Sequence, residues 1–165
     1  MASKSHLTDD ACAKIINAVV TSRQDYHNGL LAGSHQNVTQ PLQRMQNYAA
    51  RLLTRTKRNE HITPVLRRLH WLPVRQRMDF KILTFIHGAL ESYLKDMWKL
   101  HRIHRPLRSS DDEWLLQVPR VRRHEGERSA VHHGAIGWNQ LPGPLRQPMS
   151  KGCFKKQLKT FLFTR

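Results

Sequence analysis

The stretch HITPVLRRLHWLPVRQRMDFKILTF, residues 61–85, decides the fold class of this chain. Thr63 and Pro64 begin one short helix and Pro73 begins a longer one, because proline is tolerated in a first helical turn, where its missing N–H needs no partner. Apolar residues of the longer segment recur every three or four positions, namely Val74, Met78, Ile82, Phe85, Ile86 and Leu90. That period is typical of an amphipathic helix. The stretch therefore predicts consecutive helices and a mainly α fold.

A second clear helix is predicted just upstream, at residues 40–54. Thr39 can cap its start, and Pro41 then falls in the first turn, where proline is tolerated. One apolar stripe runs along it, formed by Leu42, Met45, Ala49, Leu52 and Leu53. These residues form one apolar face, because residues three and four apart share one side of a helix, and Arg44, Arg51 and Arg55 lie mostly off it.

The remaining helical signals extend this pattern in both directions. Residues 8–31 have an amphipathic pattern after Thr8, which can serve as an N-cap, and residues 93–98 predict a further short helix. We therefore expect a disordered start at residues 1–7 and a helical bundle over residues 8–100.

Beyond residue 100 the composition changes. Residues 101–113 (HRIHRPLRSSDDE) have the composition of a linker, and residues 114–119 (WLLQVP) are a candidate short strand ended by Pro119. Residues 137–148 contain three prolines and two glycines, which predicts an extended loop. We therefore expect residues 101–149 to be irregular and rich in Pro and Gly.

The chain closes with a predicted basic amphipathic helix at residues 150–165. Ser150 can cap its start. Its apolar side would carry Phe154, Leu158, Phe161 and Leu162, and its basic residues Lys155, Lys156 and Lys159 lie towards the other side. Gly152 weakens the first turn by about 1 kcal/mol relative to alanine.

Positive charge dominates the composition. The 165 residues include 28 Lys and Arg against 12 Asp and Glu, a formal net charge of +16. The excess lies in two blocks, +11 over residues 44–108 and +7 over residues 128–165, which flank a short acidic loop at residues 111–113. Such a charge attracts polyanions, and the binding weakens with salt because bound phosphates release their counterions. The alternative is a solvated basic surface that has no specific partner.

Several classes of protein are excluded. The two cysteines, Cys12 and Cys153, cannot build a disulfide framework or a four-cysteine zinc site. Each occupies an apolar position of a predicted helix, so we expect both side chains to pack in the core. No apolar run approaches the roughly 20 residues of a membrane span, and the start has no signal-peptide h-region. We therefore expect an intracellular protein, nuclear or cytoplasmic, that contacts no membrane.

No motif predicts catalysis. Asp9 and Asp10 suit the start of a helix, and Asp111 and Asp112 suit a solvated turn. The sequence contains no His-Glu-x-x-His, Cys-x-x-Cys or Gly-x-Ser-x-Gly motif and no glycine-rich phosphate loop. We therefore expect no catalytic residue, no metal site, no cofactor and no small-molecule substrate.

Four tryptophans lie near basic residues. They are Trp71, Trp98, Trp114 and Trp138. Aromatic side chains beside cations can stack on the bases of single-stranded nucleic acid. Burial in the core or anchoring of a loop is the alternative that the sequence favours for each of them.

The string QNYAARLLTRTKRNEHITPVLRRLHWLPVRQRMDFKILTF, residues 46–85, resembles the C-terminal region of LINE-type (non-LTR) retrotransposon reverse transcriptases. Within these it is most similar to the jockey and chicken-repeat-like group. Flanking pieces follow in the family's order: TSRQDYHNGLLAG at 21–33, SYL at 92–94, LRSSD at 107–111, VPR at 118–120, WNQLP at 138–142 and FKKQLKTFLF at 154–163. The resemblance therefore covers about residues 11–163.

This resemblance implies a place at and beyond the thumb of the polymerase, after the fingers and palm. That region is mostly helical and helps to hold template RNA and primer DNA, so residues 8–100 would be thumb-like. The palm's catalytic aspartates have no counterpart here, and we expect no enzyme activity. The sequence departs from the family pattern at IHGALE (86–91), at SAVHHGAIGWNQLP (129–142) and at Gly152, which replaces an acid.

Charge and resemblance together predict a partner, RNA or an RNA–DNA hybrid contacted along its backbone. The residues expected to bind it are Arg44, Arg51, Arg55, Lys57, Arg58, Arg67, Arg68, Lys155, Lys156 and Lys159. Two alternatives are a decayed, transposon-derived reading frame without a biochemical role and a domesticated adaptor that binds other proteins.

Overall fold

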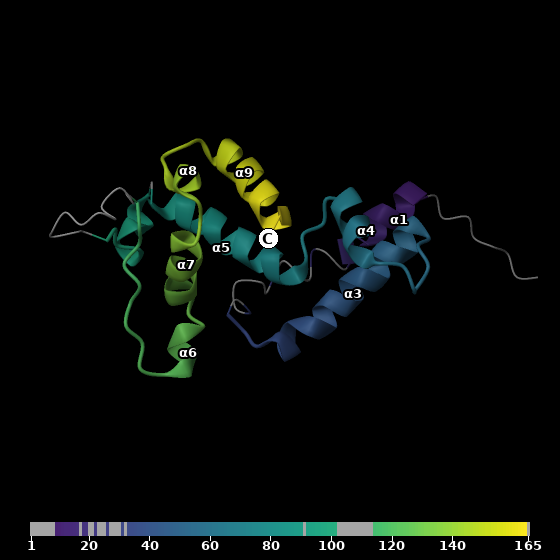
Figure 1. Ribbon diagram of the computed structural model, residues 1–165, viewed down its shortest axis with the longest axis horizontal. Helices are drawn as coiled ribbons and strands as arrows, with labels where there is room; N and C mark the ends of the chain where they lie inside the picture. Colours follow the sequence, from purple (N-terminus) through teal and green to yellow (C-terminus); the bar gives the residue numbers. More distant parts are fainter. Residues whose placement is uncertain are drawn as a thin grey trace, which may run out of the picture.

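The computed structural model describes residues 9–16, 18–19, 22, 26, 31, 33–90, 92–101 and 114–164, and the fold is mainly α, as predicted. The elements in chain order are α1 (Asp9–Ile16), α3 (Gln36–Thr54), α4 (Ile62–Arg68), α5 (Val74–Leu90), the 3-10 helix η2 (Tyr93–Met97), α6 (His124–Glu127), α7 (Ala130–Asn139), α8 (Gly143–Arg146) and α9 (Lys151–Thr164). Figure 1 shows α5 across the middle, with α1, α3 and α4 towards one end and α6, α7 and α8 towards the other. The predicted disordered start at 1–7 lies outside the described residues.

The main hydrophobic core forms around α5, which packs against α7, α9 and η2. Ile86 of α5, Trp138 of α7 and Phe154 of α9 are each at most 1% exposed. Burial of such large side chains supplies most of the favourable free energy of folding. Because this core combines residues from before and after position 100, the packing continues across the boundary at which the helical part was predicted to end.

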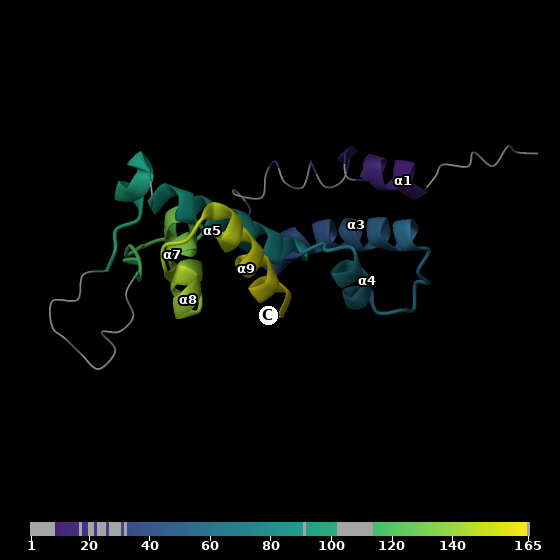
Figure 2. The ribbon, with the colours of Figure 1, turned by 90° about the horizontal axis from the view of Figure 1, so that it is seen from above.

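A smaller cluster joins α3 to α4. Ala50 of α3 is fully buried against Val65 and Leu66 of α4. Figure 2 shows α1 and α4 on opposite sides of α3. Alanine at the contact lets the two helix backbones approach closely, so this end of the molecule is held by a thin layer of small and medium side chains.

The start of α3 differs from the prediction. It begins at Gln36, and the ring Nδ1 of His35 accepts a hydrogen bond from the N–H of Asn37 at 3.3 Å, so His35 and not Thr39 is the cap. Pro41 consequently lies inside the helix and not in its first turn. Proline there removes the backbone bond that its N–H would make, and its ring crowds the carbonyl four residues earlier, a cost that the long helix accommodates near its start.

The apolar stripe predicted on this helix is partly on the surface, and its Leu42 and Leu53 are half-buried. Met45 is 52% exposed and Leu52 is 71% exposed, whereas Gln46 and Ala50 are buried. Ala49 is the member of the stripe that is buried. The face of α3 that is covered is the one whose small and amide side chains fit the turn between α4 and α5.

The region after residue 113 is more helical than predicted. Residues 130–139 form α7, capped by Ser129, whose Oγ accepts from the N–H of His132 at 3.2 Å, and the proline-rich stretch contains α8. Gly134 makes this possible, because a Cβ built there would lie 2.7 Å from Cδ1 of Ile86. The missing side chain lets α7 approach α5 closely, and burial of that face favours helix over extended loop.

Three further predictions have mixed outcomes. The candidate strand at 114–119 reduces to an isolated antiparallel bridge between Leu100 and Leu116. The cap of α9 is confirmed, because Oγ of Ser150 accepts from the N–H of Cys153 at 3.4 Å. Of the long helix predicted at 8–31, the structure describes α1 and a few later residues, and Thr8 lies outside the described residues.

Candidate nucleic-acid interface

The predicted arginines of α3 and the turn after it occupy different settings. Arg44 is exposed on α3, and Arg51 is half-buried, with its Nη2 donating to the Glu60 carbonyl at 2.7 Å. Arg55 ends the helix with a left-handed φ of 53°. Lys57 and Arg58 follow in the exposed turn that the Arg51 bond fastens to α3. Arg51, Arg55, Lys57 and Arg58 therefore form one continuous basic segment at the end of α3, and Arg44 lies two turns earlier on the helix.

A single hydrogen bond brings the two predicted basic groups together. Nη2 of Arg67, on α4, donates to the carbonyl of Phe163 in the last turn of α9 at 3.1 Å. The two residues are 96 positions apart in sequence. A guanidinium suits this position because it adds positive charge to the negative end of the α9 dipole. The contact links the last turn of α9 to the end of α4 at this one point, and no sequence pattern could have predicted it.

The lysines of α9 lie on its outer side. Lys155 and Lys156 are exposed and Lys159 is half-buried, whereas Phe154, Leu158 and Leu162 face the core. Arg68, at the end of α4, is exposed as well. Among the described residues, no carboxylate forms an ion pair with Arg44, Arg68, Lys155 or Lys156. Their charge is therefore available to a polyanion.

An aromatic residue that the prediction missed lies among the arginines of α3. Tyr48 is 62% exposed, four residues after Arg44 and three before Arg51, and Leu52 follows on the same side. The signal for Tyr48 is present in the sequence, since an aromatic between two arginines at helical spacing shares their face. An exposed tyrosine beside cations can contact bases or sugars at the edge of a bound strand.

The tryptophans separate into two groups. Trp98 and Trp138 are buried at 2% and 1% exposure, which confirms the predicted burial, although Trp138 lies in helix α7 and not in a loop. Trp71 packs beside the smaller cluster. Trp114 is 37% exposed and lines a cavity of about 760 Å³ together with Lys95, Lys99 and His101.

In the described parts of the chain, no three His, Cys, Asp or Glu side chains lie together in a way that could hold a metal ion. Cys153 is exposed, so the expectation that it packs in the core was wrong, and its Sγ accepts from Nε2 of Gln157 at 3.2 Å. Asp111 and Asp112 fall outside the described residues. None of the described helices combines the length and the apolar character that a membrane crossing requires.

Comparison with known proteins adds no relative: the sequence matches no family model, and neither curated proteins nor solved structures give a match.

Proposed function

We propose that this chain is the C-terminal, thumb-like region of a LINE-type reverse transcriptase and that it binds the backbone of RNA or an RNA–DNA hybrid. The ordered motifs of residues 11–163 support the origin, and the basic surface supports the partner. The region has no catalytic role of its own, because the aspartates of the palm have no counterpart in it. The observation that carries the binding proposal is the set of exposed cations Arg44, Arg68, Lys155 and Lys156, with which no carboxylate of the described residues forms an ion pair.

Two glutamines of α3 hold the helices that carry the basic residues in place. Nε2 of Gln46 donates to the Leu72 carbonyl at 2.8 Å, and Oε1 of Gln43 accepts from the N–H of Val74 at 2.8 Å. These bonds lie on either side of Pro73, which has no N–H of its own. They fasten α3 to the turn that connects α4 with α5. The buried amide of Gln46 and the half-buried amide of Gln43 therefore help to fix the position of the α3 arginines relative to α4.

The phosphate backbone is the partner best suited to these side chains. Arginine and lysine neutralise phosphates without reading bases, and arginine can contact one phosphate through two N–H groups. Between residues 26 and 78 the chain contains one acid, Glu60, and from residue 128 to the end it contains none. A surface with so few acids repels other cations and attracts nucleic acid at long range.

The test is binding of a fluorescent RNA–DNA hybrid over a series of salt concentrations. We expect the logarithm of the affinity to fall linearly with the logarithm of the salt concentration, with a slope of about 0.9 for each phosphate contacted. The double variant Arg44→Gln/Arg68→Gln should reduce the slope by up to about 2. A flat salt response, or no binding at low salt, would overturn the proposal.

A matched control variant has the same net charge as Arg44→Gln/Arg68→Gln. Arg120→Gln/Arg122→Gln removes two exposed arginines that precede α6 and lie outside the predicted set. It should weaken binding only through the general loss of charge and leave the slope nearly unchanged. Equal effects of the two variants would place the interface elsewhere.

A second candidate, a domesticated adaptor, is favoured by the exposed apolar face of α3. This face carries Val38, Met45, Tyr48 and Leu52, each at least 48% exposed. Exposed apolar patches of this kind mark sites of protein interaction. Stoichiometric recovery of one partner by the intact chain, lost in Leu52→Glu, would favour the adaptor over nucleic-acid binding. If the chain is instead a decayed fragment, it should lack a cooperative thermal transition.

A further inference from the structure

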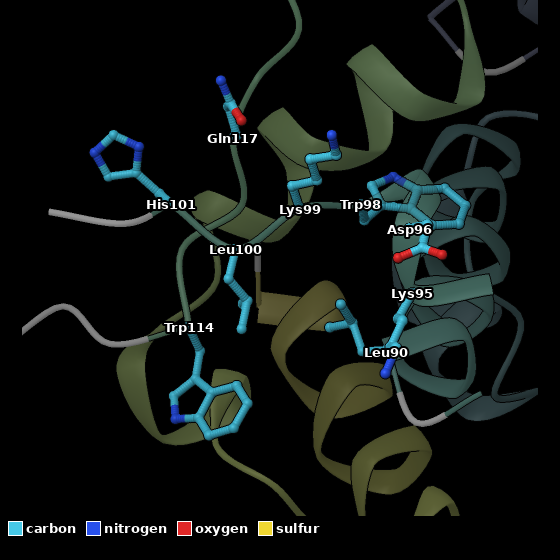
Figure 3. A pocket seen from close by; sticks show the side chains of 9 residues that line it. All are labelled: Leu90, Lys95, Asp96, Trp98, Lys99, Leu100, His101, Trp114 and Gln117. Atoms are coloured by element: carbon cyan, nitrogen blue, oxygen red, sulfur yellow. The ribbon is translucent and has the colours of Figure 1, made fainter. Parts of the chain in front are cut away.

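A cavity of about 760 Å³ opens between η2 and the bridge that joins Leu100 to Leu116. Figure 3 shows the side chain of Leu100 pointing towards the space between Trp114 on one side and Leu90 on the other. The amine of Lys95 lies beside Leu90 in the same view. This volume falls within the range of cavities that hold small organic ligands. The space is thus bounded by an aromatic ring, two leucines and a cation.

The conformation of Trp114 is unusual for its size. Its φ is +69°, in the left-handed region that bulky residues rarely adopt. The Trp114 carbonyl accepts a hydrogen bond from Nε1 of the buried Trp138 at 2.8 Å, which holds the backbone in this conformation. The ring of Trp114 nevertheless remains 37% exposed and lines the cavity. Strain of this kind is concentrated where a side chain serves a ligand and not the core.

The electrostatics of the cavity favour an anionic ligand. Lys95, Lys99 and His101 line it together with one acid, Asp96. Two cations against one anion leave the site with a net positive charge. An aromatic ring that faces a lysine across one cavity can hold the base and the phosphate of an unpaired nucleotide.

We propose that this cavity binds one unpaired base of a single-stranded nucleic acid. The base stacks on the indole of Trp114, with Leu90 and Leu100 bounding the space, and its phosphate contacts Lys95. The ligand must be single-stranded, because a paired base is stacked between its neighbours and cannot offer its face to a tryptophan. This inference rests on the proposed nucleic-acid function, but its site is separate from the arginines and lysines of α3, α4 and α9.

The experiment compares two fluorescent probes on the full chain: a short oligothymidine and an abasic oligomer of the same length. Both carry the same phosphates, so backbone contacts are equal. We expect the oligothymidine to bind about 5- to 150-fold more tightly, the ratio expected for one stacked base. Trp114→Leu should abolish this preference, whereas Trp114→Phe, which keeps an aromatic face, should retain most of it. Equal binding of the two probes to the unchanged protein would overturn the inference.

A second variant keeps the test decisive if Trp114→Leu unfolds the protein. Lys95 is exposed and lies outside the hydrophobic core. Lys95→Gln should weaken both probes and reduce the salt slope by about 0.7, the value for one phosphate of a single strand. No change in slope would remove Lys95 from the site and contradict the proposed pose.

The two proposals fail in different ways. If the hybrid binds with a steep salt dependence but the protein does not distinguish oligothymidine from the abasic oligomer, backbone binding stands and the base site is rejected. If neither probe nor the hybrid binds at low salt, both proposals are rejected. A preference for oligothymidine that survives in Trp114→Leu places base stacking at another aromatic residue and also rejects the site.

Discussion

The side-chain amide of Asn139 pairs with both backbone groups of Leu116. Oδ1 of Asn139 accepts from the Leu116 N–H at 2.8 Å, and its Nδ2 donates to the Leu116 carbonyl at 2.9 Å. The neighbouring Trp138 donates in parallel to the carbonyl of Trp114. The end of α7 thus takes the place of an adjacent strand for residues 114–116. This is why, within the part of the chain that the structure describes, a segment with strand-like sequence forms a single bridge and no sheet.

Removal of that amide should destabilise the protein. Asn139→Ala leaves the N–H and the carbonyl of Leu116, which is 2% exposed, without their partners. We expect the free energy of unfolding to fall by about 1–3 kcal/mol, the cost of unsatisfied buried polar groups. Urea denaturation followed by circular dichroism measures it. Asn59→Ala, in an exposed turn, is the control and should change little. Equal stability of the two variants would show that the pairing is not needed.

Gln46 should contribute to stability although it is polar. It is 1% exposed and donates to the carbonyl of Leu72 at 2.8 Å. In Gln46→Ala that carbonyl loses its donor and a small cavity forms, so we expect a loss of about 2 kcal/mol. Gln40→Ala changes an exposed glutamine of the same helix and serves as the control for helix propensity. If Gln46→Ala melts at the same temperature as Gln40→Ala, Gln46 does not stabilise the packing of α3 against the turn between α4 and α5.

Two glycines should respond in opposite directions to the same change. A Cβ at Gly134 would lie 2.7 Å from Ile86 and 3.0 Å from Ile82, so Gly134→Ala should cost about 1–3 kcal/mol through overpacking. A Cβ at Gly88, in α5, meets nothing within 4 Å. Gly88→Ala should therefore stabilise the protein by about 0.5–1 kcal/mol, because alanine favours helix. Thermal unfolding of both variants measures the contrast, and the same sign for both would contradict the close approach of α7 to α5.

The exposed face of α3 can be tested with glutamate. Leu52 is 71% exposed, so Leu52→Glu should change the free energy of unfolding by no more than about 0.5 kcal/mol. Ala50, two residues earlier, is fully buried against Val65 and Leu66. Ala50→Glu should unfold α3 from α4, at a cost of about 3 kcal/mol or more, because the carboxylate has no partner there. A large loss of unfolding free energy in Leu52→Glu would contradict the exposure of Leu52 and show that the predicted apolar stripe is packed.

Some features could be predicted from the sequence because their cause is local. The prolines at 64 and 73 place the starts of α4 and α5, and Ser150 caps α9, since capping and proline geometry depend on neighbouring residues alone. The predicted cationic residues lie mostly on the surface for a similar reason, because a charged group that is buried loses its hydration. The mainly α class and the exposure of most cations of the candidate interface could therefore be predicted from the sequence.

Only the tertiary structure decided which faces are covered. The period of α3 groups Met45 with Leu52, yet it cannot say whether another helix will lie on that side, and none among the described elements covers them. Helix α7 forms in a stretch of glycines and histidines because Gly134 fits against Ile86, a contact between residues 48 positions apart. Arg67 meets the end of α9 for the same kind of reason. Burial depends on partners distant in the chain, whereas helix starts and charges depend on the residues themselves.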